Sequence, residues 1–453
     1  MYDLIIIGAG PGGYHTAIRA AQKGLDVTLI EKNNIGGVCL NVGCIPTKAL
    51  YGTAHRLIQV NEENEKFGIY SENTVFDFTK TQERKEQVVN NMTSSVEGLL
   101  KKHGVNLIFG EAEFLSQNKI KINNEEIESK NIIIATGSSP LMLPFFNIDH
   151  NVILDSTDLL NIKKLPKSLI ILGAGVMGIE FASIFNAFGV KVTVLELEKQ
   201  ILPTIDKIIA SQLTKILKSR GIDIFLRKKT SVIRNDNGEA YFQLEDGTEF
   251  RAEKALISIG RKFNSDIKGL DDLGISKSPN GALIVNNAQK TSVENIYAIG
   301  DVSGGMLLAH VASYEGEKAL ADILNEEYPD SVIPSAIFSI PEIATVGITS
   351  QNSKEKLNKG MFSYQASGKA MAIGEENGLA IFYANNDDEL IGSTIMGSDA
   401  SNLIQIITIA INNKMKVNEF VKNVFPHPTL SEIVLEGVED IHGDAIHKFG
   451  KKR

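Results

Sequence analysis

The feature that most constrains the fold is a glycine-rich segment that occurs twice along the chain. The first copy begins with a strand at residues 4–7, followed by the glycine-rich turn Gly8-Ala9-Gly10-Pro11-Gly12-Gly13 and a helix at 14–23. A second strand at 27–30 follows and ends in the acid Glu31. Gly8, Gly10 and Gly13 permit a tight turn, the close approach of a pyrophosphate and close helix packing. The segment therefore predicts a βαβ unit that binds a dinucleotide, with Glu31 accepting hydrogen bonds from a ribose.

The second copy repeats this organisation with the same spacing. It begins with a strand at residues 169–172, followed by the turn Gly173-Ala174-Gly175-Val176-Met177-Gly178 and a helix at 179–188. A second strand at 192–195 follows and ends in the acid Glu196. In both copies 23 positions separate the first glycine from the acid (8 to 31 and 173 to 196). The alternative, that one copy is a degenerate structural duplicate, is disfavoured because each keeps its glycines and its acid. Two different dinucleotides are what an electron-transfer enzyme with two sites requires.

The chain has only two cysteines, Cys39 and Cys44, and they are five positions apart. A regular helix would separate such residues by about 7.5 Å along its axis and point them in different directions. Gly43 gives backbone freedom and Pro46 cannot donate a helix hydrogen bond, so the intervening turn can distort and bring the sulfurs together. A disulfide across so short a loop is easily reduced, which predicts a redox-active disulfide. Two alternatives are buried unpaired thiols and a metal site, although the chain has no further cysteine ligands.

Length and charge narrow the class of protein. A chain of 453 residues is too long for one core and predicts about three domains. An excess of 55 carboxylates over 46 basic side chains argues against broad nucleic-acid binding. The sequence enters its first strand without a basic leader or cleavage site, and no apolar run approaches membrane-spanning length. We therefore expect a cytoplasmic protein with no membrane or nucleic-acid partner, in which a close cysteine pair indicates catalysis.

Further elements are expected around the two units. Helices are predicted at 46–59 and 78–103, short strands at 105–109, 113–115 and 119–122, and buried strands that end in glycine turns at 131–137 and 255–260. Residues 140–166 contain several prolines and are expected to form a linker and crossover.

A third buried strand, at residues 295–301, ends in a carboxylate, Asp301. At the carboxyl edge of a sheet, beside a nucleotide site, this residue could bind sugar or ribityl hydroxyls. The alternative is an ordinary exposed turn aspartate. A helix is expected to follow, to about residue 325.

From about residue 336 the composition changes, which predicts a third, α+β domain that forms a dimer interface. Two or three apolar strands, including 343–346, 380–383 and 389–395, are expected to alternate with helices such as 402–413.

The last motif of the chain contains His427 between two prolines, and Glu432. A thiol must lose a proton before it attacks a disulfide, so His427 is the candidate base, although a lone histidine is often structural. Thr429-Leu430-Ser431-Glu432 also fits a capping box, in which Glu432 would accept the amide of Thr429.

Together these motifs resemble the pyridine-nucleotide disulfide oxidoreductases. The resemblance rests on residues 36–48, the two glycine motifs, Ala135-Thr136-Gly137, Ile299-Gly300-Asp301 and His427-Pro428-Thr429, in order over nearly the whole chain. It implies an α/β fold with two Rossmann-like dinucleotide-binding domains, one inserted in the other, and a C-terminal α+β dimerisation domain. The implied FAD-binding domain comprises residues 1–141 and 266–334, the NAD-binding domain 142–265, and the dimerisation domain 335–453.

The resemblance also implies roles for single residues. The implied FAD contacts include the first glycine motif, Glu31, Lys48, Thr136, Gly137 and Asp301, and the implied NAD contacts include the second glycine motif, Glu196 and Gly260. Lys48 and Glu180 match a pair beside the isoalloxazine ring; without the resemblance, a solvated lysine and a structural acid would be the simpler interpretation. Cys39 would exchange with substrate and Cys44 would contact the flavin. In the implied homodimer, His427, oriented by Glu432, reaches the disulfide of the other subunit.

The implied reaction is oxidation of protein-bound dihydrolipoamide to lipoamide with reduction of NAD+. The partner would be a lipoyl-bearing carrier protein of a 2-oxo acid dehydrogenase or glycine cleavage complex. The charge of Glu196 would repel the 2′-phosphate of NADP and so favours NAD. Alternatives are a glutathione or mercuric reductase, or a flavin-binding scaffold with an inert cysteine pair. Mercuric reductases usually have extra C-terminal cysteines, which this sequence lacks, and glutathione reductases have basic residues at the position of Glu196.

Overall fold

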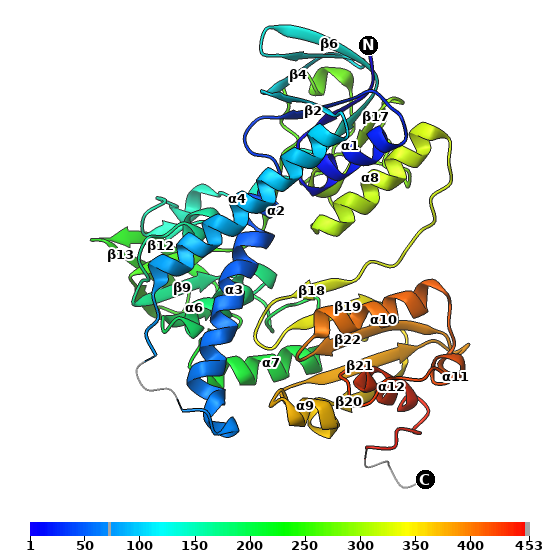
Figure 1. The fold of residues 1–453 in the computed structure, drawn as a ribbon. Helices are drawn as coiled ribbons and strands as arrows, with labels where there is room; N and C mark the ends of the chain where they lie inside the picture. Colours follow the sequence, from blue (N-terminus) through cyan, green and yellow to red (C-terminus); the bar gives the residue numbers. More distant parts are fainter. Residues whose placement is uncertain (71–73, 449–453) are drawn as a thin grey trace.

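The computed structural model describes residues 1–70 and 74–448 (Figure 1). Its first unit is built on a seven-stranded sheet in the order β3-β2-β1-β6-β5-β4, with β17 beside β6. The strands are β1 (Tyr2–Ile7), β2 (Val27–Glu31), β3 (Asn106–Phe109), β4 (Ala112–Ser116), β5 (Lys119–Ile122), β6 (Glu125–Ile134) and β17 (Ile296–Ala298). The β3-β2-β1-β6-β17 part is parallel. Its central strands are continuous apolar runs because they are buried on both faces.

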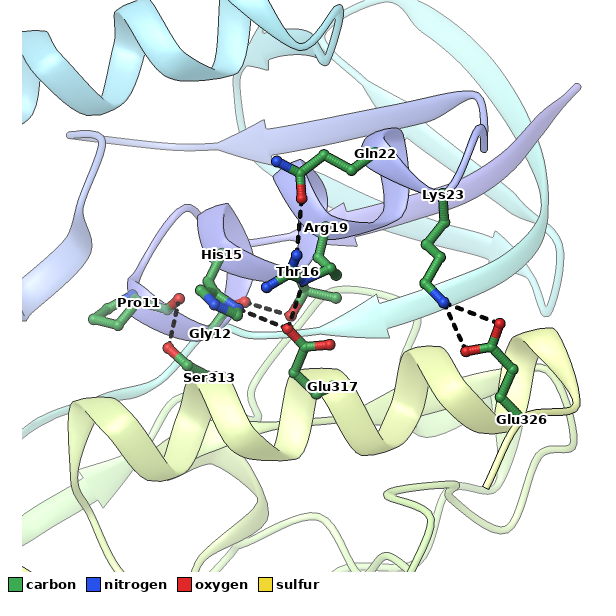
Figure 2. A network of polar contacts seen from close by, with 10 residues as sticks. All are labelled: Pro11, Gly12, His15, Thr16, Arg19, Gln22, Lys23, Ser313, Glu317 and Glu326. Carbon is green, nitrogen blue, oxygen red and sulfur yellow. Dashed lines mark hydrogen bonds and ion pairs between the residues drawn. The ribbon is translucent and has the colours of Figure 1, made fainter. Parts of the chain in front are cut away.

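Two helices that are distant in sequence cover one face of this sheet side by side, α1 (Pro11–Gln22) and α8 (Ala309–Leu324). Figure 2 shows two ion pairs here, Arg19–Glu317 between the helices and Lys23–Glu326 just beyond their ends. Their N–O distances are 2.9 and 2.8 Å. A Cβ atom at Gly316 would lie 1.9 Å from the Thr16 hydroxyl oxygen, so the helices pack too closely for any larger residue. This contact fixes the helix after Asp301 against the helix of the first glycine-rich turn.

The second unit contains a parallel five-stranded sheet in the order β11-β10-β9-β15-β8 and an antiparallel sheet β12-β13-β14. Its elements are β8 (Ile153–Leu154), α5 (Ser156–Leu160), β9 (Ser168–Leu172), α6 (Val176–Ala187), β10 (Lys191–Leu195), α7 (Lys207–Ser219), β11 (Asp223–Phe225), β12 (Thr230–Asp236), β13 (Glu239–Leu244), β14 (Glu249–Ala252) and β15 (Lys254–Ile257). The expected linker at 140–166 therefore also contains the edge strand β8 and the helix α5. The sequence missed β8 because a two-residue strand has no periodicity.

A two-stranded antiparallel ribbon connects the two units, β7 (Ser138–Pro140) with β16 (Arg261–Phe263). The chain leaves the first unit through β7 and returns through β16, since β17 then rejoins the first sheet. One nucleotide-binding unit is thus inserted in the other, as predicted.

The C-terminal unit is an antiparallel sheet in the order β18-β19-β22-β21-β20 with helices packed on it. Its elements are β18 (Ser335–Ile337), β19 (Ile343–Gly347), β20 (Asn358–Ser363), α9 (Gly368–Ala372), β21 (Leu379–Ala384), β22 (Leu390–Met396), α10 (Ala400–Asn412), α11 (Val417–Phe420) and α12 (Glu432–Glu439). Five strands replace the two or three expected, because β18 has three residues and β20 is largely polar.

Three more helices follow β2, namely α2 (Gly37–Val42), α3 (Cys44–Ile58) and α4 (Phe78–Lys102). Helix α4 runs from the first unit across to the second, and α3 packs on α4 and on α6 (Figure 1). The remaining short turns are η1 (Gln59–Glu63), η2 (Asn64–Phe67), η3 (Pro144–Phe146), η4 (Asp271–Leu273), η5 (Gly300–Ser303) and η6 (Tyr364–Ala366). Among the helices in the described residues, none combines the length and the apolar character needed to cross a membrane.

Candidate active site

The first and third glycines of each turn are required by the fold. Gly8 and Gly173 have φ angles of +107° and +103°, and a Cβ atom there would lie 2.4 and 2.2 Å from a carbonyl oxygen of the neighbouring strand end. A Cβ atom at Gly13 or Gly178 would lie 1.8 or 2.0 Å from the carbonyl oxygen of the first glycine. These four positions therefore exclude any side chain.

The middle glycines, Gly10 and Gly175, have no such role in packing. A Cβ atom at either would meet no atom of the described chain within 4 Å, and α1 and α6 begin at the next residue. A glycine in open space at the positive end of a helix leaves room for a phosphate to approach the backbone closely. The two turns therefore fit the pyrophosphates of two dinucleotides.

This difference between the glycines gives a direct prediction. Gly175→Ala should raise the KM for NAD+ by about tenfold with Tm unchanged, because its methyl group meets only the ligand. Gly178→Ala should instead destabilise the fold, and Gly98→Ala on α4, which is equally open, should leave the KM unchanged and raise Tm slightly, because alanine favours a helix interior. Steady-state kinetics and thermal melts check this; an unchanged KM in Gly175→Ala would place the pyrophosphate elsewhere.

The acids that end the two second strands make matching contacts. In each copy the carboxylate accepts one amide N–H from the glycine-rich turn and one from two residues further along the chain. The bonds run from Ala9 and Asn33 to Glu31, at 2.8 and 2.7 Å, and from Ala174 and Glu198 to Glu196, at 2.6 and 2.8 Å. A carboxylate has about four acceptor sites, so both residues keep the capacity to accept ribose hydroxyls.

The cysteines lie on either side of a break between two helices. α2 ends at Val42 and α3 begins at Cys44, with Gly43 between them at φ −143° and ψ −113°. A Cβ atom at Gly43 would lie 2.8 Å from the Val38 carbonyl oxygen, so the break needs a glycine. The two side chains are free thiols that hydrogen-bond to each other. The predicted distortion therefore does bring Cys39 and Cys44 together.

The two thiols differ in acidity. The hydrogen bond to Cys44, with burial and the charge of Cys44, raises the pKa of Cys39 above the usual value for a thiol. The same hydrogen bond lowers the pKa of Cys44 to about 7; burial opposes this shift and the positive charge of Lys48 supports it. Cys44 is therefore the thiolate of the pair near neutral pH, and Cys39 holds the proton.

Lys48, one turn after Cys44 on α3, forms an ion pair with Glu180 on α6. Its ammonium group contacts both carboxylate oxygens, at 3.0 and 2.8 Å, and lies 4.5 Å from the ring centroid of Phe338. The Phe338 N–H also donates to Glu180 at 2.9 Å. The Glu180 side chain is only 7% exposed, so both partners compensate a buried charge. This pair joins all three units beside the cysteines.

Asp301, on η5, faces the ribbon that connects the two nucleotide units. The Ser138 hydroxyl donates to Asp301 Oδ2, and Arg261 Nε lies 3.7 Å from the same oxygen while donating to Ser138 at 2.6 Å. No described residue hydrogen-bonds to Asp301 Oδ1. Asp301 is therefore not fully exposed, because its side chain is 24% exposed and one oxygen is fixed by Ser138. Its role in binding a ligand hydroxyl stays a prediction.

The other strand-end residues meet at the same ribbon. The Thr136 hydroxyl donates to the Asn264 carbonyl at 2.8 Å, and the Asn264 N–H donates to the Gly137 carbonyl at 3.0 Å. The Gly260 carbonyl accepts the Leu141 N–H at 3.1 Å. A Cβ atom at Gly137, where φ is +70°, would meet no described atom within 4 Å. Thr136, Gly137 and Gly260 therefore lie at the junction of the two units.

His427 and Glu432 form a pair in the C-terminal unit. His427 Nδ1 lies 2.9 Å from Glu432 Oε1, and the Thr429 N–H donates to Glu432 Oε2 at 2.9 Å. Glu432 thus makes both contacts that the sequence left as alternatives. Although partial burial alone would raise it, the pKa of Glu432 lies below its usual value because of these hydrogen bonds. The imidazole is 79% exposed, and none of the described residues hydrogen-bonds to its Nε2.

Cys39, Cys44, Lys48 and Glu180 lie together where α3 packs on α6. Figure 1 shows α12, which begins at Glu432, in the C-terminal unit and well apart from α2. The sequence missed Ser138, Arg261 and Phe338, because only the folded chain brings them to Asp301 and Glu180.

Comparison with known proteins identifies the class. Residues 2–316 match the family model of the pyridine nucleotide-disulphide oxidoreductases, and residues 333–437 match the dimerisation domain of the same family. The chain therefore belongs to the pyridine nucleotide-disulphide oxidoreductases, a flavin disulfide oxidoreductase family, and its domains imply FAD and NAD(H) as cofactors and a homodimer as the assembly.

Curated relatives narrow the class further. The chain is 40% identical to dihydrolipoyl dehydrogenases of Staphylococcus aureus and Geobacillus stearothermophilus, with 98% and 99% of this chain and 97% and 98% of those proteins covered. Among solved structures, LpdA from Mycobacterium tuberculosis has a TM-score of 0.91 at 26% identity, covering 97% of this chain and all of that one. The flavoprotein disulfide reductase RclA from Escherichia coli has a TM-score of 0.87 at 28% identity, covering 97% and 99%.

Proposed function

We propose that this chain is an NAD-dependent dihydrolipoyl dehydrogenase that oxidises dihydrolipoamide on a lipoyl-bearing carrier protein. The observation that carries the proposal is the pair of adjacent thiols beside the Lys48–Glu180 ion pair, in a chain that also has two glycine-rich turns of the dinucleotide-binding type. The curated relatives that bear this activity in their names support it. The carrier would belong to a 2-oxo acid dehydrogenase or glycine cleavage complex in the cytoplasm.

The assignment of the cofactors follows the predicted domain boundaries. FAD would be held by residues 1–141 and 266–334, through the first glycine turn, Glu31, Gly137 and Asp301. NAD would be held by residues 142–265, through the second glycine turn and Glu196. When bound, FAD supplies an acceptor for two electrons and delivers them to NAD+ as a hydride.

The thiol chemistry uses the cysteines in their disulfide form. His427 of the partner subunit removes a proton from one substrate thiol, and the resulting thiolate attacks Cys39. The Cys39–Cys44 bond breaks, and Cys44 leaves as a thiolate that Lys48 stabilises. The second substrate thiol gives its proton to the histidine as its sulfur displaces Cys39, and Cys39 takes the proton that the histidine held before. Lipoamide is released, with one of its two protons on Cys39 and the other on the histidine. Overall the dithiol loses two electrons and two protons, NAD+ becomes NADH, and one proton enters the solvent.

The exposure of the His427–Glu432 pair supports a site shared between subunits. The imidazole projects from one chain with its acid behind it, and the cysteines of that chain lie in another unit. A second copy can bring the two halves together through the dimerisation domain.

Initial-rate assays test the proposal. With NAD+ as acceptor, we expect kcat/KM for dihydrolipoamide to exceed kcat/KM for reduced glutathione by about 10²-fold. With dihydrolipoamide as substrate, we expect kcat/KM with NAD+ to exceed kcat/KM with NADP+ by about 10²-fold. The nucleotide preference follows because a 2′-phosphate would approach the Glu196 carboxylate.

Each contrary result has its own meaning. Comparable oxidation of glutathione would indicate another disulfide reductase, and comparable efficiency with NADP+ would show that Glu196 points away from the ribose. A protein that binds FAD but oxidises neither thiol would be a scaffold.

A further inference from the structure

Helix α8 contains a half-buried acid that the proposed reaction does not use. Among the residues that the structure describes, Glu315 has no ion-pair partner within 4 Å, whereas Glu317, two positions along, pairs with Arg19 on α1 (Figure 2). Glu315 Oε2 instead accepts the backbone N–H of Gly300 at 2.6 Å. The carboxyl group of Glu315 is thus half-buried without an ion-pair partner among the described residues, and it accepts a hydrogen bond from the Gly300 amide. This arrangement suggests that the position of the Gly300 amide matters.

Gly300 is the residue at which the chain turns from β17 toward Asp301. Its φ angle is +69°, and a Cβ atom there would lie 2.9 Å from Ala312 Cβ. Ala312 and Glu315 are three positions apart and therefore lie on one face of α8. The helix thus fixes the turn twice, by contact at Ala312 and by the hydrogen bond from Gly300 to Glu315.

The side chain of Asp301 is fixed from the opposite side. Ser138 donates to Oδ2 and Arg261 lies behind it, which leaves Oδ1 without a protein partner among the described residues. The backbone of the turn and the carboxylate are therefore held by separate elements. The direction of Oδ1 depends on both.

The surroundings of Glu315 explain its acidity. Burial is the main cause that raises the pKa of Glu315 to about 7, and the nearby Asp301 carboxylate adds to this rise. The Gly300 amide and Lys318 on α8 oppose the rise. Lys318 is itself bonded to Asp330 and Asn287. The neighbouring face of α1 presents Gly12 and Thr16, which carry no charge. Above about pH 7 Glu315 is therefore a charged acceptor, and below it a neutral one.

We propose that Glu315 is a positioning residue for FAD, which holds the Gly300 turn so that Asp301 presents its free oxygen to the hydroxyl groups of the cofactor. The inference rests on the proposed function in one respect, the assignment of Asp301 to the flavin. Glu315 itself does not touch the ligand, and its effect passes through Asp301.

The test measures FAD affinity of the apoprotein by flavin fluorescence at pH 8. Glu315→Ala should weaken binding about tenfold and Glu315→Gln about threefold, because an amide oxygen is a weaker acceptor than a carboxylate. Glu317→Gln, the same change on the same helix, is the matched control and should bind as the wild type does. At pH 6 the wild type and Glu315→Gln should converge, which a purely structural defect would not produce.

A double-mutant cycle separates the possible failures. If Glu315 acts through Asp301, then Glu315→Gln should have no further effect in an Asp301→Asn background. If Asp301→Asn alone leaves FAD affinity unchanged, the assignment of Asp301 is wrong and the inference fails with it. Two other results would overturn the positioning role alone, provided that Asp301→Asn weakens FAD binding. In one, the Glu315 variants bind FAD as Glu317→Gln does. In the other, the effects of Glu315→Gln and Asp301→Asn on binding add fully in the double variant. Should Glu315→Ala not fold, the Glu315→Gln cycle decides.

Discussion

Replacement of His427 by glutamine is expected to lower kcat/KM for dihydrolipoamide by about 10³-fold while FAD remains bound. A free thiol is mostly protonated at neutral pH, and only the thiolate attacks a disulfide. The exposed imidazole, oriented by Glu432 at 2.9 Å, is the base that the structure offers. Glutamine keeps the size and a hydrogen bond to Glu432 but cannot take the proton.

Half-reactions locate the defect. Stopped-flow reduction of the His427→Gln protein by dihydrolipoamide should be slow, whereas its reduction by NADH should proceed at the wild-type rate. His442→Gln is a matched control, because His442 forms a similar pair with Asp388 at 2.7 Å in the same unit. Near-normal reduction by dihydrolipoamide would reject His427 as the base, and an equal loss with NADH would indicate a structural defect instead.

The parts of the fold that could be predicted are those in which a local steric requirement fixes residue type and spacing. Gly8 and Gly13, like Gly173 and Gly178, face carbonyl oxygens within 2.4 Å of where a Cβ would be, so the same pattern must recur wherever this turn is built. The buried parallel strands beside them are apolar on both faces for an equally general reason.

Contacts between distant parts of the chain could not be predicted in this way. Ser138 and Asp301 are 163 positions apart, and Arg261 and Ser138 are 123 apart. Neither pairing has a periodicity or a spacing that marks it. By contrast, the resemblance implied the pairing of His427 with Glu432, and the three-residue spacing from Thr429 to Glu432 indicated the capping contact. The strands β8 and β18 were missed because two or three residues give no pattern.

The second large effect concerns the cysteines. Cys39→Ser and Cys44→Ser should each reduce turnover by about 10⁴-fold or more, because neither protein can form the disulfide that accepts the electrons of the substrate. The two variants should nevertheless differ. Cys39→Ser keeps the thiol of Cys44 and an O–H donor beside it, whereas Cys44→Ser keeps only the thiol with the raised pKa.

Titration of the Cys39→Ser holoprotein then tests which sulfur carries the charge. Because the hydrogen bond from its neighbour and the charge of Lys48 lower the pKa of Cys44, its thiolate should form below the usual range of a thiol, and the long-wavelength absorbance of a thiolate beside a flavin should grow with pH over that range. Adding Lys48→Met removes a positive charge that stabilises the thiolate, so the midpoint should move to higher pH. Lys32→Met, which removes a lysine that pairs with Glu111 on the surface, is the control and should leave the midpoint in place. A band that appears only in Cys44→Ser would reverse the roles of the two cysteines, because the sulfur that leaves during exchange must be the one that is stable as a thiolate.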